Sequence, residues 1–315
     1  MKLTISNRSL KGLLGLMALS AGLECSAAAA TKACDLAPTV STAEGTAGQC
    51  GFNASTKSFK GSKKEQAQCL TRKVNKGAKI GDPTITDDLA GLLETVPPSI
   101  EKLKSFIDKQ GIKAAQLGGA LNHTISASYF IIHDTSTPNC SSENVGAAAC
   151  PTRGKFPTNL NDADWVVNEN FLGHPKPYPN RLAHVFTNRV GASITEVDFS
   201  EHITTTKFEK CFDAQKKKSL FVGVENIQPR VGDPAIPKPG KKLNDLVAPT
   251  PGFADAQYDR LALLYIAASS RHGEWLILAH HAVLDHYFAD GHDDPQNFDM
   301  DKLSSAVTKT LEKIK

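Results

Sequence analysis

The sequence predicts an α/β fold, in the wider sense that includes α+β, with a mixed β-sheet flanked by helices. Three observations carry this prediction. Short runs rich in β-branched and aromatic residues occur at 126–133, 219–227 and 275–283. An apolar helical pattern at 256–272 lies between the last two runs. Strands that alternate with helices, together with a hairpin pattern before residue 200, are typical of a mixed sheet.

A small, mainly helical domain is expected before this sheet, over residues 31–115. Its helices are predicted at 64–74, at 86–96 and from residue 100 onward. The second of these ends at a Pro-Pro pair, which cannot continue a helix. Ser99 is the expected N-cap of the third, because its side-chain oxygen can accept a bond from a free backbone N–H group.

The sheet itself is expected in a second domain over residues 116–315. A hairpin is predicted from the alternating segments 183–189 and 193–199, with Gly191 near its turn. The helix at 256–272 is expected to stop at Gly273. A Pro- and Gly-rich stretch over 226–252 indicates a long surface loop.

Residues 1–30 have the three-part layout of a secretory signal peptide. Basic residues begin the segment, a short apolar core follows, and a run of small residues at 26–30 offers a cleavage site. We therefore expect an exported protein of the periplasm or the extracellular space. The chain contains no apolar run of about 18 residues, so no stable membrane insertion is expected after cleavage.

Charge and cysteine content restrict the partners and the compartment. Lys and Arg number 36 against 33 Asp and Glu, a balance too even to indicate a nucleic-acid partner. One of the seven cysteines lies in the signal segment, which leaves an even number in the expected mature chain. An even count in an exported chain indicates disulfides. A Cys140–Cys150 pair is expected because the loop between the two cysteines is short.

Three segments carry residues suited to catalysis. His133 ends a buried strand in IIHDTS, Glu225 lies near the end of another in VGVEN, and HHAVLD is followed by GHDDP at 280–295. Each alone is explained as well by a structural histidine, a strand-end glutamate or an Asp-rich turn. Together they supply what a catalytic zinc site needs. It takes three protein ligands, a carboxylate base and a group that faces the developing oxyanion.

With these motifs, residues 123–300 resemble the zinc-dependent N-acetylmuramoyl-L-alanine amidases of the amidase-2 and peptidoglycan-recognition family. In that family the first strand ends in a zinc-ligand histidine, and the residue that matches it here is His133. A hairpin of the type LAHVFTNRVG follows and contains His184. The family's Gly-Ile-Glu strand corresponds to VGVEN, and its last ligand before a proline corresponds to Asp294.

The resemblance leaves the second histidine ligand open between two neighbours. Side chains alternate in a strand, so only one of His280 and His281 can face the metal. His281 is preferred because HAVLD is most similar to the family pattern, and His280 is the alternative. Two residues before its last ligand, the family has a residue that stabilises the oxyanion, which is Lys or Thr in many members. Here that position holds His292, which would act as a protonated imidazole. Residues 137–180 look like an insertion beside the site.

The resemblance implies an amidase-2-like catalytic domain with Zn²⁺ held by His133, His281 and Asp294. Glu225 and His292 would be the catalytic residues, and His184 would be structural or substrate-lining. Asp134 and Asp293 could orient the ligand imidazoles. The implied substrate is peptidoglycan, cut between N-acetylmuramic acid and L-alanine. The alternatives are a non-catalytic peptidoglycan-recognition module, an exported toxin or lysin with the same chemistry, and a zinc amidohydrolase that acts on a non-wall amide.

Overall fold

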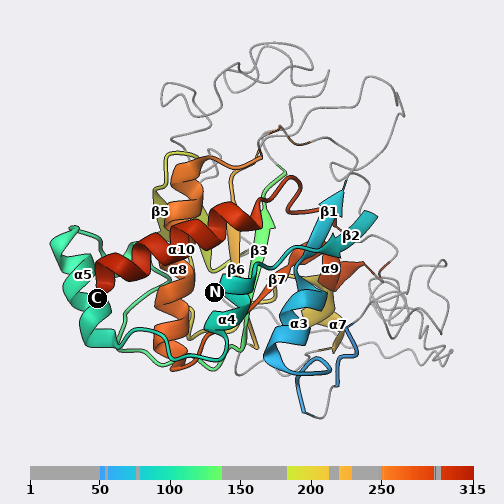
Figure 1. Cartoon of the computed structure of the whole chain (residues 1–315), viewed down its shortest axis with the longest axis horizontal. Coiled ribbons are helices and arrows are strands. Elements are labelled where there is room, and N and C mark those ends of the chain that lie inside the picture. The colour runs from blue at the N-terminus through green and yellow to red at the C-terminus, as the bar shows by residue number, and fades with distance from the viewer. Residues whose placement is uncertain are drawn as a thin grey trace, which may run out of the picture. The chain divides into compact units, whose positions relative to one another are not determined.

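The computed structural model describes a large part of the 315-residue chain (Figure 1). The described residues are 50–53, 56–75, 79–136, 183–212, 220–228, 248, 250, 252–286, 288 and 292–315. The expected signal peptide, the Cys140–Cys150 pair, the 137–180 insertion and most of the 226–252 loop lie outside them.

A five-stranded mixed sheet forms the centre of the fold, in the order β5-β4-β6-β3-β7. Strand β3 (Tyr129–Asp134) pairs in parallel with β6 (Phe221–Asn226) and with β7 (Ile277–His280). Strand β4 (Val185–Thr187) is parallel to β6, and β5 (Ser193–Thr195) is antiparallel to β4. The predicted mixed sheet and its hairpin are therefore confirmed.

The inner strands β3 and β6 are apolar up to their last two residues, because both faces of the sheet are covered. Every residue of β3 is buried, and so is every residue of β6 except Glu225, which is partly buried. Continuous apolar runs of this kind are typical of parallel strands covered on both faces. The register places His133 of β3 opposite Glu225 of β6. Two of the residues expected to carry chemistry are therefore neighbours across the sheet.

Two glycines set the local chain direction where the sequence predicted turns. Gly191, in the β4–β5 turn, has φ +78°, and a Cβ atom there would lie 2.6 Å from the carbonyl oxygen of Ala256. Gly273 has φ +88° and caps the C-terminus of α8 (Asp255–His272). Both positions favour glycine because other residues adopt positive φ at a cost. The predicted helix end is thus confirmed.

Three helices pack against one another beside the sheet. The long helix α8 is buried on almost all sides, and α10 (Met300–Ile314) crosses it (Figure 1). Helix α5 (Ile100–Lys109) contacts both and begins at the predicted cap, where Ser99 Oγ accepts a bond from the backbone N–H of Lys102. Among the described helices, none combines the length and the apolar character needed to cross a bilayer.

The first predicted helix is shorter than expected. Helix α3 spans Lys63–Leu70, and the chain then turns into β1 (Arg72–Asn75), which pairs antiparallel with β2 (Lys79–Pro83). The helix predicted over 64–74 was therefore too long at its C-terminal end. Arg72 explains the change, because its Nε donates a bond to the Gly81 carbonyl of β2, a long-range partner that the local pattern does not contain. A short helix α4 (Asp87–Leu92) follows.

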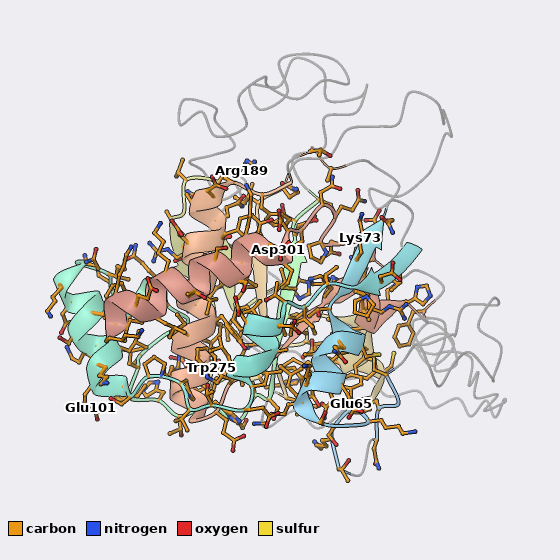
Figure 2. The ribbon with its side chains drawn as sticks, in the orientation of Figure 1. Glu65, Lys73, Glu101, Arg189, Trp275 and Asp301 are labelled. Atoms are coloured by element: carbon orange, nitrogen blue, oxygen red, sulfur yellow. A yellow bond between two sulfur atoms is a disulfide. The ribbon has the colours of Figure 1, made fainter. Side chains whose placement is uncertain are left out.

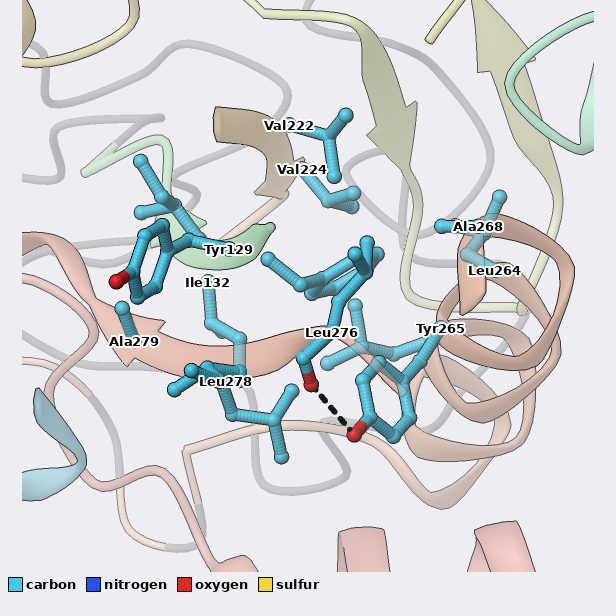
Figure 3. Packing of buried hydrophobic residues seen from close by; sticks show 14 of the residues in the cluster. Tyr129, Ile132, Val222, Val224, Leu264, Tyr265, Ala268, Leu276, Leu278 and Ala279 are labelled. Carbon is cyan, nitrogen blue, oxygen red and sulfur yellow. Dashed lines mark hydrogen bonds between the residues drawn. The ribbon is translucent and has the colours of Figure 1, made fainter. Parts of the chain in front are cut away.

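The segment before residue 115 shares a hydrophobic core with the sheet. The backbone N–H of Phe59 donates to Tyr129 Oη (3.1 Å), and the two rings lie 5.2 Å apart. Trp275 (Figure 2) donates from Nε1 to Thr95 Oγ1 (3.0 Å) and packs on Tyr265. Figure 3 shows the centre of this core, where Tyr265 Oη donates to the Leu276 carbonyl (2.8 Å). The described parts of both expected domains thus contribute to one core.

A disulfide between Cys50 and Cys69 ties residue 50 to α3. The even cysteine count predicted disulfides, but it did not single out this pair. The bond closes a loop with a sequence separation of 19 residues. Replacing both cysteines by serine is expected to lower the free energy of unfolding by about 3 kcal/mol, because the unfolded chain regains the entropy of that loop. Urea unfolding of the double variant and the oxidised wild type measures this difference. Coincident unfolding curves would contradict the expectation.

Candidate metal centre

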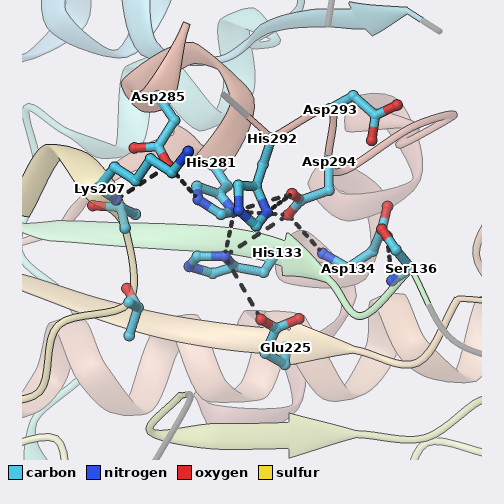
Figure 4. A network of polar contacts seen from close by, with 12 residues as sticks. His133, Asp134, Ser136, Lys207, Glu225, His281, Asp285, His292, Asp293 and Asp294 are labelled. Carbon is cyan, nitrogen blue, oxygen red and sulfur yellow. Dashed lines mark hydrogen bonds and ion pairs between the residues drawn. The ribbon is translucent and has the colours of Figure 1, made fainter. Parts of the chain in front are cut away.

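The residues expected to carry chemistry meet at the carboxyl ends of the parallel strands. His133 lies near the end of β3, Glu225 lies near the end of β6, and His281 directly follows β7 (Figure 4). Asp294 comes from the segment that precedes α10. Ligands of open α/β sheets usually bind at this edge, because loops there surround a pocket whose floor is the rigid sheet.

The chain changes from strand to helix between the two candidate histidines. Strand β7 ends at His280, and the short helix α9 (His281–Asp285) begins at the next residue. The predicted strand over 275–283 was therefore too long at its C-terminal end. His280 Nδ1 lies 2.8 Å from the carbonyl oxygen of Arg72, so its ring points toward β1. His281 turns the other way and joins His133 and Asp294.

Three ligand atoms surround one point. His133 Nδ1 lies 2.9 Å from His281 Nδ1, and the latter lies 3.1 Å from Asp294 Oδ2. His133 Nδ1 and Asp294 Oδ2 are 3.7 Å apart. Ligands in a tetrahedral zinc site with bonds of about 2.0–2.1 Å lie about 3.3 Å from one another. This buried His-His-Asp group therefore has the donors and the spacing to hold a metal ion.

A hydrogen bond fixes the orientation of the His281 ring. Its Nε2 lies 2.9 Å from Asp285 Oδ2, so the Nε2–H group can donate to this carboxylate. Its Nδ1 atom faces the centre of the group and could bind a metal ion once it has lost its proton. Carboxylate partners of this type fix the tautomer and the orientation of metal-binding imidazoles.

The charges of the group also suit a cation. Burial and the neighbouring His281 hold the pKa of His133 well below its usual value, so His133 is neutral and has a lone pair to offer. Burial opposes ionisation of Asp294, but His281 outweighs it and holds the pKa of Asp294 below its usual range. The pKa of His281 is raised against the effect of burial by Asp294 and Asp285. A divalent cation at this position would replace the His281 Nδ1 proton that faces Asp294.

Glu225 lies beside the group without being part of it. Its Oε1 is 3.9 Å from His133 Nδ1, and its Oε2 is buried with no hydrogen-bond partner among the described residues. Burial and the nearby Asp294 raise the pKa of Glu225 well above its usual value. A buried carboxylate without donors to its second oxygen is suited to taking up a proton.

His292 reaches the group from the solvent side. Its Nδ1 lies 3.7 Å from Asp294 Oδ1, and 43% of its side chain is exposed. Burial of the rest of the ring and the nearby His281 lower the pKa of His292. The expected protonated stabiliser is thus disfavoured, although a neutral imidazole can still donate one hydrogen bond.

The two aspartates proposed to orient imidazoles make a different set of contacts. The backbone N–H of Asp134 donates to Asp294 Oδ2 (3.1 Å), and its carboxylate accepts from the N–H of Gln296 (3.1 Å). Asp293 Oδ2 accepts from Gln296 Nε2 (2.6 Å). These bonds hold the segment that carries Asp294 against the end of β3.

The carboxylate that contacts His281 Nε2 is Asp285, a residue that was not predicted from the sequence. It is fully buried and accepts bonds from the backbone N–H groups of Lys207 (3.1 Å) and Phe208 (2.9 Å) at the start of α7 (Lys207–Phe212). The spacing of four residues in HAVLD places Asp285 and His281 on one face of a helix. That signal was available but was obscured by the strand predicted there.

Asp285→Asn is expected to weaken metal binding about 10- to 100-fold, because the amide cannot match the carboxylate as an acceptor for His281. Competition with a fluorescent chelator measures the affinity. Asp301→Asn, a change of the same kind at an exposed position, is the control. Equal affinities in the two variants would show that Asp285 does not support the metal.

His184 lies apart from the group and is structural in its contacts. It is fully buried, its Nδ1 accepts from the N–H of Gly223 (3.1 Å), and its Nε2 lies 3.2 Å from the carbonyl oxygen of Glu201. Burial lowers its pKa to about 4. A neutral His184 therefore ties the segment before β4 to β6.

Comparison with known proteins identifies no relative of the chain. No protein family model, no curated protein and no solved structure matches the chain. The geometry of the described residues and the motifs of the sequence carry the functional argument.

Proposed function

We propose that this protein is a zinc-dependent amidase that hydrolyses the bond between N-acetylmuramic acid and L-alanine in peptidoglycan. One observation carries the proposal. The buried group His133, His281 and Asp294 lies beside the partly buried carboxylate of Glu225, at the carboxyl edge of a mixed sheet. These residue types follow one another along the chain in the same order as in the amidase motifs that the sequence resembles.

The donor set favours zinc and a hydrolytic role. Two imidazoles and one carboxylate are a usual ligand set of catalytic zinc, which keeps a fourth position for water or substrate. A zinc ion held by these residues would activate water and polarise the amide carbonyl. Asp285 would keep His281 in the ligating tautomer through the 2.9 Å contact.

Glu225 would move the proton. Its carboxylate is close enough to the ligand group to accept a proton from the attacking water and to pass it to the leaving amine of L-alanine. His292 stands at the solvent side of the group, where its N–H can donate to the oxyanion that develops on the carbonyl oxygen.

Peptidoglycan is the substrate that best fits the other features of the sequence. The expected signal peptide would bring the protein to the compartment that contains the wall, and the Cys50–Cys69 disulfide suits an oxidising compartment. A module that only recognises the wall needs no buried base beside its ligands. The position of Glu225 therefore favours an enzyme over a recognition module.

Chelation tests the proposal. The full chain is incubated with purified peptidoglycan, and newly formed amino groups are counted before chelation, after chelation and after zinc is returned. We expect release that stops with the chelator and resumes with zinc. Binding to peptidoglycan without release, by a zinc-loaded chain, would support the recognition module. If the chain neither binds nor cleaves peptidoglycan, the substrate would instead be an amide outside the wall.

A further inference from the structure

Two distances that join His292 to the metal group are similar to those of His133. His133 Nδ1 lies 3.7 Å from one oxygen of Asp294, and His292 Nδ1 lies 3.7 Å from the other oxygen. The His133 and His281 ring centroids are 4.3 Å apart, and those of His292 and His281 are 4.5 Å apart. By these two distances His292 is similar to His133, which in addition has its Nδ1 atom 2.9 Å from His281 Nδ1 (Figure 4).

The backbone directs His292 and Asp294 to the same place. Asp293, the residue between them, is turned away and accepts a hydrogen bond from Gln296 Nε2 (2.6 Å). The backbone N–H of Asp134 fixes the Asp294 carboxylate at 3.1 Å, so the segment is anchored next to His292. His292 and Asp294, two residues apart, therefore both face the metal group from this anchored segment.

We propose that His292 is a fourth, exchangeable protein ligand of the metal, which closes the coordination shell when no substrate is bound. This inference rests on the proposed metal centre and concerns its resting state. With His292 bound, the shell has four protein ligands, the arrangement of structural zinc sites. Because 43% of its side chain is exposed, His292 has room to turn outward and free that position.

The same residue would then have two positions. Turned inward, His292 occupies the place that water or the substrate carbonyl needs. Turned outward, it remains at the rim, where its N–H can face the oxyanion. His133, His281 and Asp294 are buried and held by the sheet, by Asp285 and by Asp134, so His292 is the ligand of this set that can exchange.

Ligand counting by X-ray absorption tests the inference without any substrate. Zinc-loaded full chain should show three imidazoles per zinc, and His292→Ala should show two with an additional oxygen ligand. The zinc affinity of His292→Ala should fall about tenfold or more. His292→Lys, which keeps a hydrogen-bond donor at this position, should also show two imidazoles. Circular dichroism of the two variants verifies that they fold.

Two imidazoles in wild type and in both variants would overturn the inference. Two zinc ions per chain would also overturn it, because His281, Asp285 and His292 offer ligand atoms within 4.8 Å of one another and could form a separate site. A chain that binds no zinc would overturn both this inference and the proposed function. Three imidazoles in a protein that cleaves no peptidoglycan would support the inference and contradict the proposed function alone.

Discussion

Glu225→Gln is expected to lower the rate of peptidoglycan amide hydrolysis by about 100- to 10,000-fold, the usual contribution of a general base. Glutamine has nearly the same size and keeps an acceptor oxygen, but it cannot take up the proton of the attacking water. Zinc content should not change, because Glu225 Oε1 lies 3.9 Å from His133 Nδ1 and outside the ligand group. Steady-state assays and metal analysis of the same preparation measure the two effects.

A matched substitution separates the loss of the base from a general loss of charge. Glu94→Gln makes the same change at an exposed position of the N-terminal segment and should leave the rate unaltered. If Glu225→Gln loses zinc together with activity, then Glu225 is a metal ligand. If it keeps both, then the proton is moved by another group and the proposed role of Glu225 is wrong.

His281→Ala is expected to abolish activity and to weaken zinc binding by more than about 100-fold, because it removes a ligand rather than a partner of a ligand. The neighbouring variant His280→Ala should keep zinc and activity. It removes the bond to the Arg72 carbonyl, so its cost should appear as a loss of stability of about 1–3 kcal/mol.

The pair is a strict test because the two positions are adjacent and both side chains are buried. Zinc titration by competition and urea unfolding are measured for each variant. Equal zinc affinities in the two variants would contradict the assignment of His281. A larger loss in His280→Ala would move the ligand role to His280 and would require a different course of the chain after β7.

The elements that the sequence predicted well are those defined by local patterns. The buried strands β3 and β6 are continuous apolar runs, and α8 combines a long apolar pattern with Gly273 at its end. The β4–β5 hairpin follows from alternation and from Gly191. In each case the information lies within a few residues, so propensity and patterning were sufficient.

The errors occurred where distant contacts decide the structure. Helix α3 ends early because Arg72 bonds to the Gly81 carbonyl in β2. Strand β7 stops at His280 because His281 begins a helix whose Asp285 is held by the backbone N–H groups of α7. Neither contact is visible in a local window. The second error also concealed the His281–Asp285 pair.

That His133, His281 and Asp294 lie together was predictable only through the motifs. His133 and Asp294 are far apart in the sequence, and they meet because parallel strands end at one edge of the sheet and Asp134 anchors Asp294 there. Spacing could not have assembled them. The order of the motifs selected the residues, and the structure then supplied the distances of 2.9–3.7 Å among the ligand atoms.

Mass spectrometry of the digestion products tests the central claim most directly. Purified peptidoglycan is treated with the zinc-loaded full chain, with the chelated chain and with Glu225→Gln. We expect intact stem peptides with a free L-alanine amino terminus, together with glycan strands that have lost them, from the zinc-loaded wild type alone. Products cut within the glycan or within the stem peptide, or unchanged peptidoglycan in all three digests, would contradict the assignment as an N-acetylmuramoyl-L-alanine amidase.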